Sequence, residues 1–221
     1  MVSAVSRRGP HHRPSAPGGT GGPRIVGALE NAASPRAPRA DVVRNRAALV
    51  DAAAKAFAEH GADASVEDVA RRANVGIGTL YRHFPTRDAL VLAAYRREVD
   101  VLCASADELL ATTTADEALA TWMQQFVDYV ATKRGMASAL ETMIDAGSEP
   151  LVDARSDMVS AVGRLLAAAA KTGRVRGHVA PENLLRAMSG HCLATDGVGW
   201  KDQARLLVGL LRDGLRYGAT H

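Results

Sequence analysis

Four side chains that can hydrogen-bond, stack or carry charge lie close together in one short stretch: Thr79, Tyr81, Arg82 and His83. Around them, Ile77, Leu80 and Phe84 are spaced three and four apart, which predicts that they share the buried face of one short helix. The four polar residues then lie on the outer face, with Tyr81 towards one side. Tyrosine and histidine can contact phosphate or stack on sugar, and threonine can bond phosphate or meet a thymine methyl group. The stretch predicts contact with nucleic acid; the alternative is a packed helix with a solvated face.

The elements that position this face can be predicted from neighbouring residues. Ser65 is followed three residues later by Asp68, a capping-box pattern that begins a helix directly after the serine. Asn74 suits a tight turn, because asparagine tolerates the left-handed backbone conformation. Gly76 can begin the next helix, and Pro85 ends it. Two short helices joined by a tight turn form a helix-turn-helix, whose second helix fits the major groove of DNA.

The start of this second helix is also suited to a phosphate. Backbone N–H groups at a helix N-terminus favour anions, and Gly76 and Ile77 provide them here. Gly78 costs about 1 kcal/mol inside a helix relative to alanine. We expect that its missing side chain allows the backbone to approach phosphate closely.

Three stretches resemble the TetR family of bacterial transcriptional regulators: residues 65–70 (SVEDVA), 75–84 (VGIGTLYRHF) and 87–90 (RDAL). Asn74 stands where this family usually has glycine, Gly76 where it often has serine, and Arg87 where lysine is common. The resemblance implies an all-α protein with an N-terminal three-helix DNA-binding domain and a C-terminal helical domain that binds an effector and dimerises. The residues expected to contact DNA are Arg44, Arg46, Ser65, Gly76, Ile77, Gly78, Thr79, Tyr81, Arg82, His83 and Arg87.

The positive charge of the chain is concentrated at its N-terminus. The net charge is +3, yet residues 1–40 hold six arginines and a single acid. They are rich in Gly, Pro and Ser without periodicity, so we expect a disordered basic arm. A solvated tail is favoured for residues 1–30, although phosphate contact stays open. DNA contact is favoured for the arginines next to the first helix: Arg36, Arg39, Arg44 and Arg46.

The remaining chain is expected to form two domains. Residues 41–86 are assigned to the helix-turn-helix domain and residues 87–221 to the regulatory and dimerisation domain, with a long first helix as connector. No alternating β-branched run occurs, so every element is expected to be helical. The predicted helices span residues 41–60, 66–73, 77–84, 87–110, 115–135, 136–146, 149–171, 181–194 and 201–217.

Composition also indicates where the protein works. No run of 18 apolar residues predicts a membrane span, and Arg7 and Arg8 are followed by no apolar stretch typical of a secretory signal. A cytoplasmic protein is expected. Cys103 and Cys192 lie in apolar helical patterns and are interpreted as buried, reduced thiols, with a redox-sensing pair as the alternative.

The resemblance implies an internal ligand cavity in the C-terminal domain. Trp122, Phe126 and Tyr129 lie four and three apart on one helical face, in a chain with only 4% aromatic residues. His191 is a lone polar residue on an apolar helix and could orient a ligand. The candidate ligand contacts are Trp122, Phe126, Tyr129, Met136, Met143, Met188, His191 and Cys192, and ordinary core is the favoured interpretation for each of them.

The last helix carries an apolar stripe that fits a subunit interface. It contains Leu206, Leu207, Leu210, Leu211, Gly214 and Leu215. Such a stripe alone is more often core, but members of this family pair their last two long helices in a dimer. The resemblance implies a homodimer, and a two-fold dimer implies a palindromic operator.

Motifs for catalysis are missing from the sequence. It contains no G-x-S-x-G, H-E-x-x-H, C-x-x-C or Gly-Lys-Ser/Thr motif, and its seven histidines show no metal-ligand spacing. We expect no enzymatic activity, cofactor or metal. The expected function is a DNA-binding transcriptional repressor released from its operator by a small-molecule effector. The alternatives are a non-inducible architectural DNA-binding protein and a helical enzyme that merely carries the motif.

Overall fold

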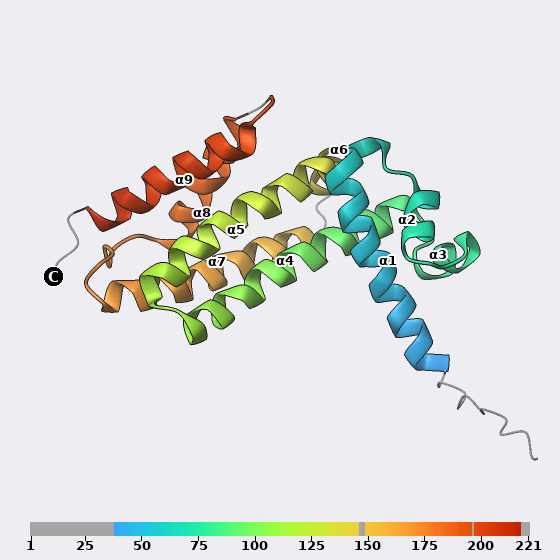
Figure 1. Cartoon of the computed structure of the whole chain (residues 1–221), viewed down its shortest axis with the longest axis horizontal. Coiled ribbons are helices and arrows are strands. Elements are labelled where there is room, and N and C mark those ends of the chain that lie inside the picture. Colours follow the sequence, from blue (N-terminus) through green and yellow to red (C-terminus); the bar gives the residue numbers. More distant parts are fainter. Residues whose placement is uncertain (1–37, 146–148, 196, 218–221) are drawn as a thin grey trace, which may run out of the picture. The chain divides into compact units, whose positions relative to one another are not determined.

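The computed structural model describes residues 38–145, 149–195 and 197–217. All elements in these ranges are helical, as expected from the sequence (Figure 1). They are α1 (Pro38–His60), the 3₁₀ turn η1 (Gly61–Asp63), α2 (Val66–Arg72), α3 (Ile77–His83), α4 (Arg87–Thr112), α5 (Ala115–Gly135), α6 (Ala137–Asp145), α7 (Glu149–Lys171), α8 (Pro181–Leu193) and α9 (Trp200–Arg216). No described helix has the length and apolar character that a bilayer span requires.

The first helix begins earlier than predicted. It starts at Pro38 instead of Asp41, because the fixed φ of proline suits the first turn of a helix. The last three residues of the expected arm are therefore helical, and residues 1–37 lie outside the described part of the chain. The helical spacing of Ala47, Val50, Ala54 and Phe57 predicts that all four face inward, but Ala47 is exposed. It lines a groove between α1 and α4, together with Ala89 and Ala93 of α4.

The helix-turn-helix forms as its local signals predict. The Ser65 hydroxyl accepts a hydrogen bond from the Asp68 N–H at 3.0 Å, and Asn74 has a left-handed φ of 54°. The capping box is only half formed, because the Asp68 carboxylate is held by Arg71 and Arg72. Those guanidiniums also hold the pKa of Asp68 below its usual range.

α4 is the longest of the described helices, with 26 residues. α4 packs against α1, and it also runs along α5 and α7 (Figure 1). Thr86 caps its start by accepting a hydrogen bond from the Ala89 N–H at 3.1 Å. Leu90, Ala94 and Val99 of α4 are fully buried in the core that these helices share.

The end of α5 touches the end of α1 backbone to backbone. A Cβ atom built on Gly135 would lie only 1.9 Å from the carbonyl oxygen of Phe57. Gly61, which ends α1 with a φ of 57°, lies against the same glycine. Only a residue without a side chain fits at position 135.

Candidate nucleic-acid interface and ligand cavity

The outer face of α3 presents Tyr81 and Arg82. Tyr81 is 46% exposed and Arg82 is exposed, whereas Thr79 and His83 are half-buried beside them. Ile77 was expected to be buried with Leu80 and Phe84, but it is 41% exposed. It is the first residue of α3 and lies one turn before Leu80, which is the first residue of the helix to reach the core.

The backbone at the start of α3 is open to solvent. A Cβ atom added to Gly76 or Gly78 would meet no described atom within 4 Å. Gly76 begins the helix without a side-chain cap, as expected. This surface can therefore approach a flat or convex partner without displacing any side chain.

The arginines near α3 differ in their contacts. Arg46 of α1 places its guanidinium 5.1 Å from the centre of the Phe84 ring, so α1 and the end of α3 are held together. Arg44 pairs with Asp41 on its own helix. Among the described residues, no carboxylate lies within ion-pair distance of Arg46 or Arg82, and their charges stay available to an anionic partner.

Two other expected DNA contacts are engaged within the chain. The Ser65 hydroxyl caps α2. The Arg87 guanidinium donates to the carbonyl oxygens of Ala62 at 2.8 Å and Ala64 at 3.2 Å, and it lies 5.4 Å from the centre of the Phe57 ring. In this geometry Ser65 and Arg87 stabilise the local fold through contacts within the chain. The residue types and their spacing in the sequence did not reveal these contacts.

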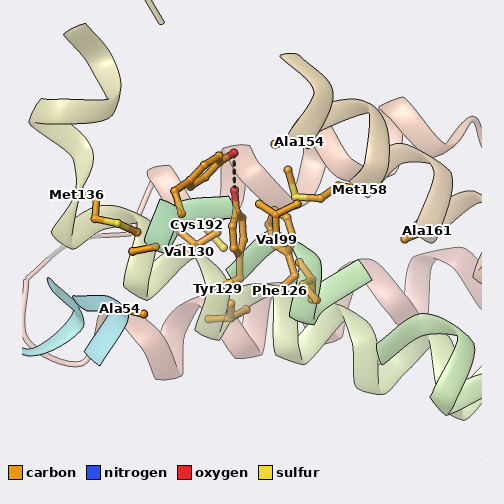
Figure 2. Close-up of a cluster of buried hydrophobic side chains, with 14 of the residues drawn as sticks. Ala54, Val99, Phe126, Tyr129, Val130, Met136, Ala154, Met158, Ala161 and Cys192 are labelled. Atoms are coloured by element: carbon orange, nitrogen blue, oxygen red, sulfur yellow. Dashed lines mark hydrogen bonds between the residues drawn. The ribbon is translucent and has the colours of Figure 1, made fainter. Parts of the chain in front are cut away.

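A cavity of about 520 Å³ lies among α5, α6, α7 and α8, and Tyr95 of α4 reaches it. Phe126 and Tyr129 line it, as expected, with ring centres 5.5 Å apart (Figure 2). The Tyr129 hydroxyl donates to the Tyr95 hydroxyl at 3.1 Å, and burial raises the pKa of both phenols. This volume is in the range of small-molecule sites in proteins.

The other expected ligand contacts lie elsewhere. Trp122 is fully buried, and its indole N–H donates to the Leu102 carbonyl oxygen at 2.8 Å. The Nδ1 atom of His191 is 2.6 Å from the Ala187 carbonyl oxygen on its own helix. The remaining residues that were expected at the cavity but do not line it are Met136, Met143, Met188 and Cys192.

Several cavity residues were not predicted from the sequence. Lys133 continues the helical spacing of Phe126 and Tyr129 by one turn, so the periodicity of α5 contained the signal. Arg155 and Leu140 come from α7 and α6, and only the packing of helices brings them to the same cavity.

The two cysteines are not bonded to each other. Cys103 is half-buried and Cys192 is buried, and both are free thiols. Burial raises the pKa of the Cys103 thiol to about 11, so the thiol stays protonated and unreactive at neutral pH. Within the described ranges, no group of three His, Cys, Asp or Glu side chains is arranged to hold a metal ion.

Comparison with known proteins identifies the family. Residues 49–94 match the bacterial regulatory proteins of the tetR family, and residues 114–217 match the SbtR-like transcriptional regulator C-terminal domain. A TetR transcriptional regulator from Streptomyces coelicolor is 42% identical, with a TM-score of 0.71, over 79% of this chain and 99% of that one. The TetR transcription regulatory protein from Mycobacterium vanbaalenii is 33% identical, with a TM-score of 0.63, over 80% of this chain and 98% of that one.

A more distant structure shows the same fold. The TetR-like regulator LfrR from Mycobacterium smegmatis, solved in complex with proflavine, is 24% identical, with a TM-score of 0.55, over 78% of this chain and 96% of that one. Regulators of this family bind operator DNA, dimerise and bind small-molecule effectors. The chain belongs to the TetR family of bacterial transcriptional regulators and is a DNA-binding regulator of transcription.

Proposed function

We propose that this regulator is a repressor that binds a palindromic operator as a homodimer and leaves it when a small molecule fills the cavity. One observation carries the proposal: α4 packs against α1 of the helix-turn-helix region, and its Tyr95 lines the cavity. A ligand that binds better to one position of α4 shifts the protein towards that position, and only by the difference between its two affinities.

On the DNA side, we assign the base and phosphate contacts to the outer face of α3. Tyr81 and Arg82 are its most exposed polar side chains, and Thr79 and His83 flank them. The exposed Ile77 suits a thymine methyl group. Arg44 and Arg46 of α1 provide phosphate contacts beside this face. In this proposal α1–α3 form the DNA-binding domain, α4 connects, and α5–α9 form the regulatory domain.

We place the dimer interface on α8 and α9. Leu206 and Leu210 of α9 are 63% and 61% exposed in the single chain, and Leu193 at the end of α8 is 74% exposed. Exposed large apolar side chains on neighbouring helices are typical of a subunit interface. A regulator whose partner is the bacterial operator acts in the cytoplasm, where we place this protein.

The test begins with selection of bound sequences from random double-stranded DNA. The selected sites should contain an inverted repeat with half-site centres about one helical turn apart, or a multiple of it. Arg82→Ala should weaken binding to the selected operator by about tenfold, because it removes a contact of about 1–3 kcal/mol. Lys171→Ala removes an exposed cation outside α1–α3 that, like Arg82, makes no ion pair within the described chain, and it is the matched control.

Two results would contradict the proposal. One is a selection that yields no inverted repeat. The other is an Arg82→Ala protein that binds the operator as tightly as the parent. If DNA is bound specifically but no small molecule that enters the cavity releases it, the chain is a non-inducible architectural DNA-binding protein, and the repressor mechanism is rejected.

A further inference from the structure

The cavity is basic at one end. Lys133 and Arg134 of α5 and Arg155 of α7 line it, against one acidic lining residue, Glu141. Arg134 is already engaged, because its guanidinium donates to two backbone carbonyls and lies 3.8 Å from the centre of the Trp200 ring. Lys133 and Arg155 therefore remain as the cations that face the cavity.

Neither of these two cations is neutralised by the described part of the chain. No described carboxylate, including that of Glu141, lies within 4.0 Å of Lys133 or Arg155. Lys133 is half-buried, and burial followed by the charge of Arg155 lowers the pKa of its ammonium group. Both cations line the same cavity, and the charge of Arg155 disfavours the charged form of Lys133. An anion between them would relieve both the repulsion and the lost hydration.

Most of the remaining lining is apolar. Phe126, Leu140, Met158 and Leu185 line it, and Figure 2 shows Phe126 and Met158 close to the tyrosine pair. Lys133 lies seven positions after Phe126 on α5, which corresponds to about 10 Å along the helix axis. A ligand that uses both ends needs an apolar body of about this length and one anionic group.

The Tyr95 hydroxyl adds a polar contact between the two ends. It accepts the hydrogen bond from Tyr129, and its own hydrogen has no acceptor among the described residues. It can therefore donate to a carbonyl or ether oxygen on the ligand.

We propose that the ligand of this cavity is an apolar organic acid, whose carboxylate lies between Lys133 and Arg155 and whose body packs against Phe126 and Met158. The inference rests on the proposed function in assigning the cavity to the effector. A cationic or neutral ligand of the same size would leave the two basic groups unpaired, and such pockets discriminate against it.

The experiment compares carboxylates with their uncharged amides on the full-length protein. The probes are decanoate with decanamide, and 2-naphthoate with 2-naphthamide, measured by isothermal titration calorimetry at pH 7.5. At least one carboxylate should bind about tenfold or more tightly than its amide, because the charge-assisted bonds are lost in the amide. Lys133→Gln and Arg155→Gln should each remove most of this preference, because they should weaken acid binding far more than amide binding.

Lys171→Gln is the matched control, since it removes an exposed lysine of α7 that does not line the cavity. Arg155 is exposed, so its variant should fold even if Lys133→Gln does not, and circular dichroism checks both. Amides that bind as tightly as the acids would overturn the proposal. Unchanged acid binding by folded Arg155→Gln would do so too, as would no binding of either acid up to about 1 mM.

Operator release is measured in parallel to separate the two proposals. If the acids bind in a Lys133-dependent way but leave operator binding intact, the proposal of an organic-acid ligand is supported and the proposal that a cavity ligand releases the operator is rejected. If an amide or an amine releases the operator while the acids do not bind, release stands and the ligand class fails.

Discussion

The Arg87 side chain, at the start of α4, forms hydrogen bonds to the turn that follows α1. Its guanidinium bonds the carbonyl oxygens of Ala62 and Ala64 and lies over the Phe57 ring. Hydrogen bonds from charged donors contribute more to stability than those between neutral groups. This side chain therefore fixes where α2 and α3 lie relative to the connector helix, and its effect on DNA binding is expected to be indirect.

We predict that two arginines that lie five residues apart, Arg82 and Arg87, contribute very differently to the stability of the fold. Arg87→Ala should lower the free energy of unfolding by about 1–2 kcal/mol, because two carbonyl groups lose their donor. Arg82→Ala should change it by less than about 0.5 kcal/mol, since its exposed side chain makes no ion pair in the described chain. Urea unfolding measures both. An Arg87→Ala protein of unchanged stability that has lost operator affinity would mean that Arg87 contacts DNA directly.

At the scale of helices, two neighbouring arginines connect α4 to its partners. Arg96 donates to Asp157 of α7 at 3.0 Å and to the Pro150 carbonyl oxygen at 3.3 Å. Arg97 donates to Asp51 of α1 at 3.2 Å. Because α7 also lines the cavity, one turn of α4 is linked both to a ligand-binding helix and to α1.

Asp157→Asn should therefore reduce the coupling between effector binding and operator binding more than it reduces the stability of the fold. An exposed ion pair contributes up to about 1 kcal/mol to folding, so the free energy of unfolding should change by no more than this. The factor by which an effector weakens operator binding should fall by the equivalent of about 0.5–2 kcal/mol. Asp107→Asn is the control, because Asp107 pairs with Arg164 and also joins α4 to α7. Equal coupling in the two variants would exclude Arg96 from this role.

The close contact of α5 with α1 gives a second prediction at this scale. Gly135→Ala should destabilise the protein by about 1–3 kcal/mol, because the added Cβ would overlap the Phe57 carbonyl group and force the helices apart. Gly78→Ala, where the added Cβ meets nothing within 4 Å, should instead stabilise it by up to about 1 kcal/mol. Thermal unfolding of both variants tests the contrast, and equal melting temperatures would refute it.

Helix limits followed from the sequence wherever a local signal sets them. Ser65, Asn74 and Thr86 act through atoms within a few residues, so their caps and turn were predictable. Ala47 and Ile77 were misplaced because burial depends on which helix lies opposite, which spacing along one helix does not contain. Most of the cavity lining was missed for the same reason: Lys133 extends the α5 stripe, but Arg155 reaches the cavity only through the packing of α7.

At the scale of the whole molecule, the exposed apolar side chains of α9 form the surface that we propose for the dimer interface. Leu206 and Leu210 are largely exposed, whereas Leu207 and Leu211 are half-buried and Leu215 is buried within the chain. The stripe predicted from the sequence is thus divided: one edge packs on the chain itself, and the other is exposed, where we propose that a second subunit packs.

The double change Leu206→Glu and Leu210→Glu should give a folded monomer with weak operator binding, because two buried carboxylates are incompatible with an apolar interface. Val101→Glu alters an exposed apolar residue of α4 and is the control. Light scattering gives the mass of each. An intact dimer of the double variant would place the interface elsewhere.

The contact between Gly135 and Phe57 also limits how this protein can be recombined. A designer who wants a new DNA specificity would exchange the segment before α4 for that of another regulator. The donor segment must leave its backbone at the position of Phe57 free to meet an α5 that ends in glycine. A chimera joined at the start of α4 takes position 57 from one protein and position 135 from another. The donor segment and the residue at position 135 therefore have to be chosen together.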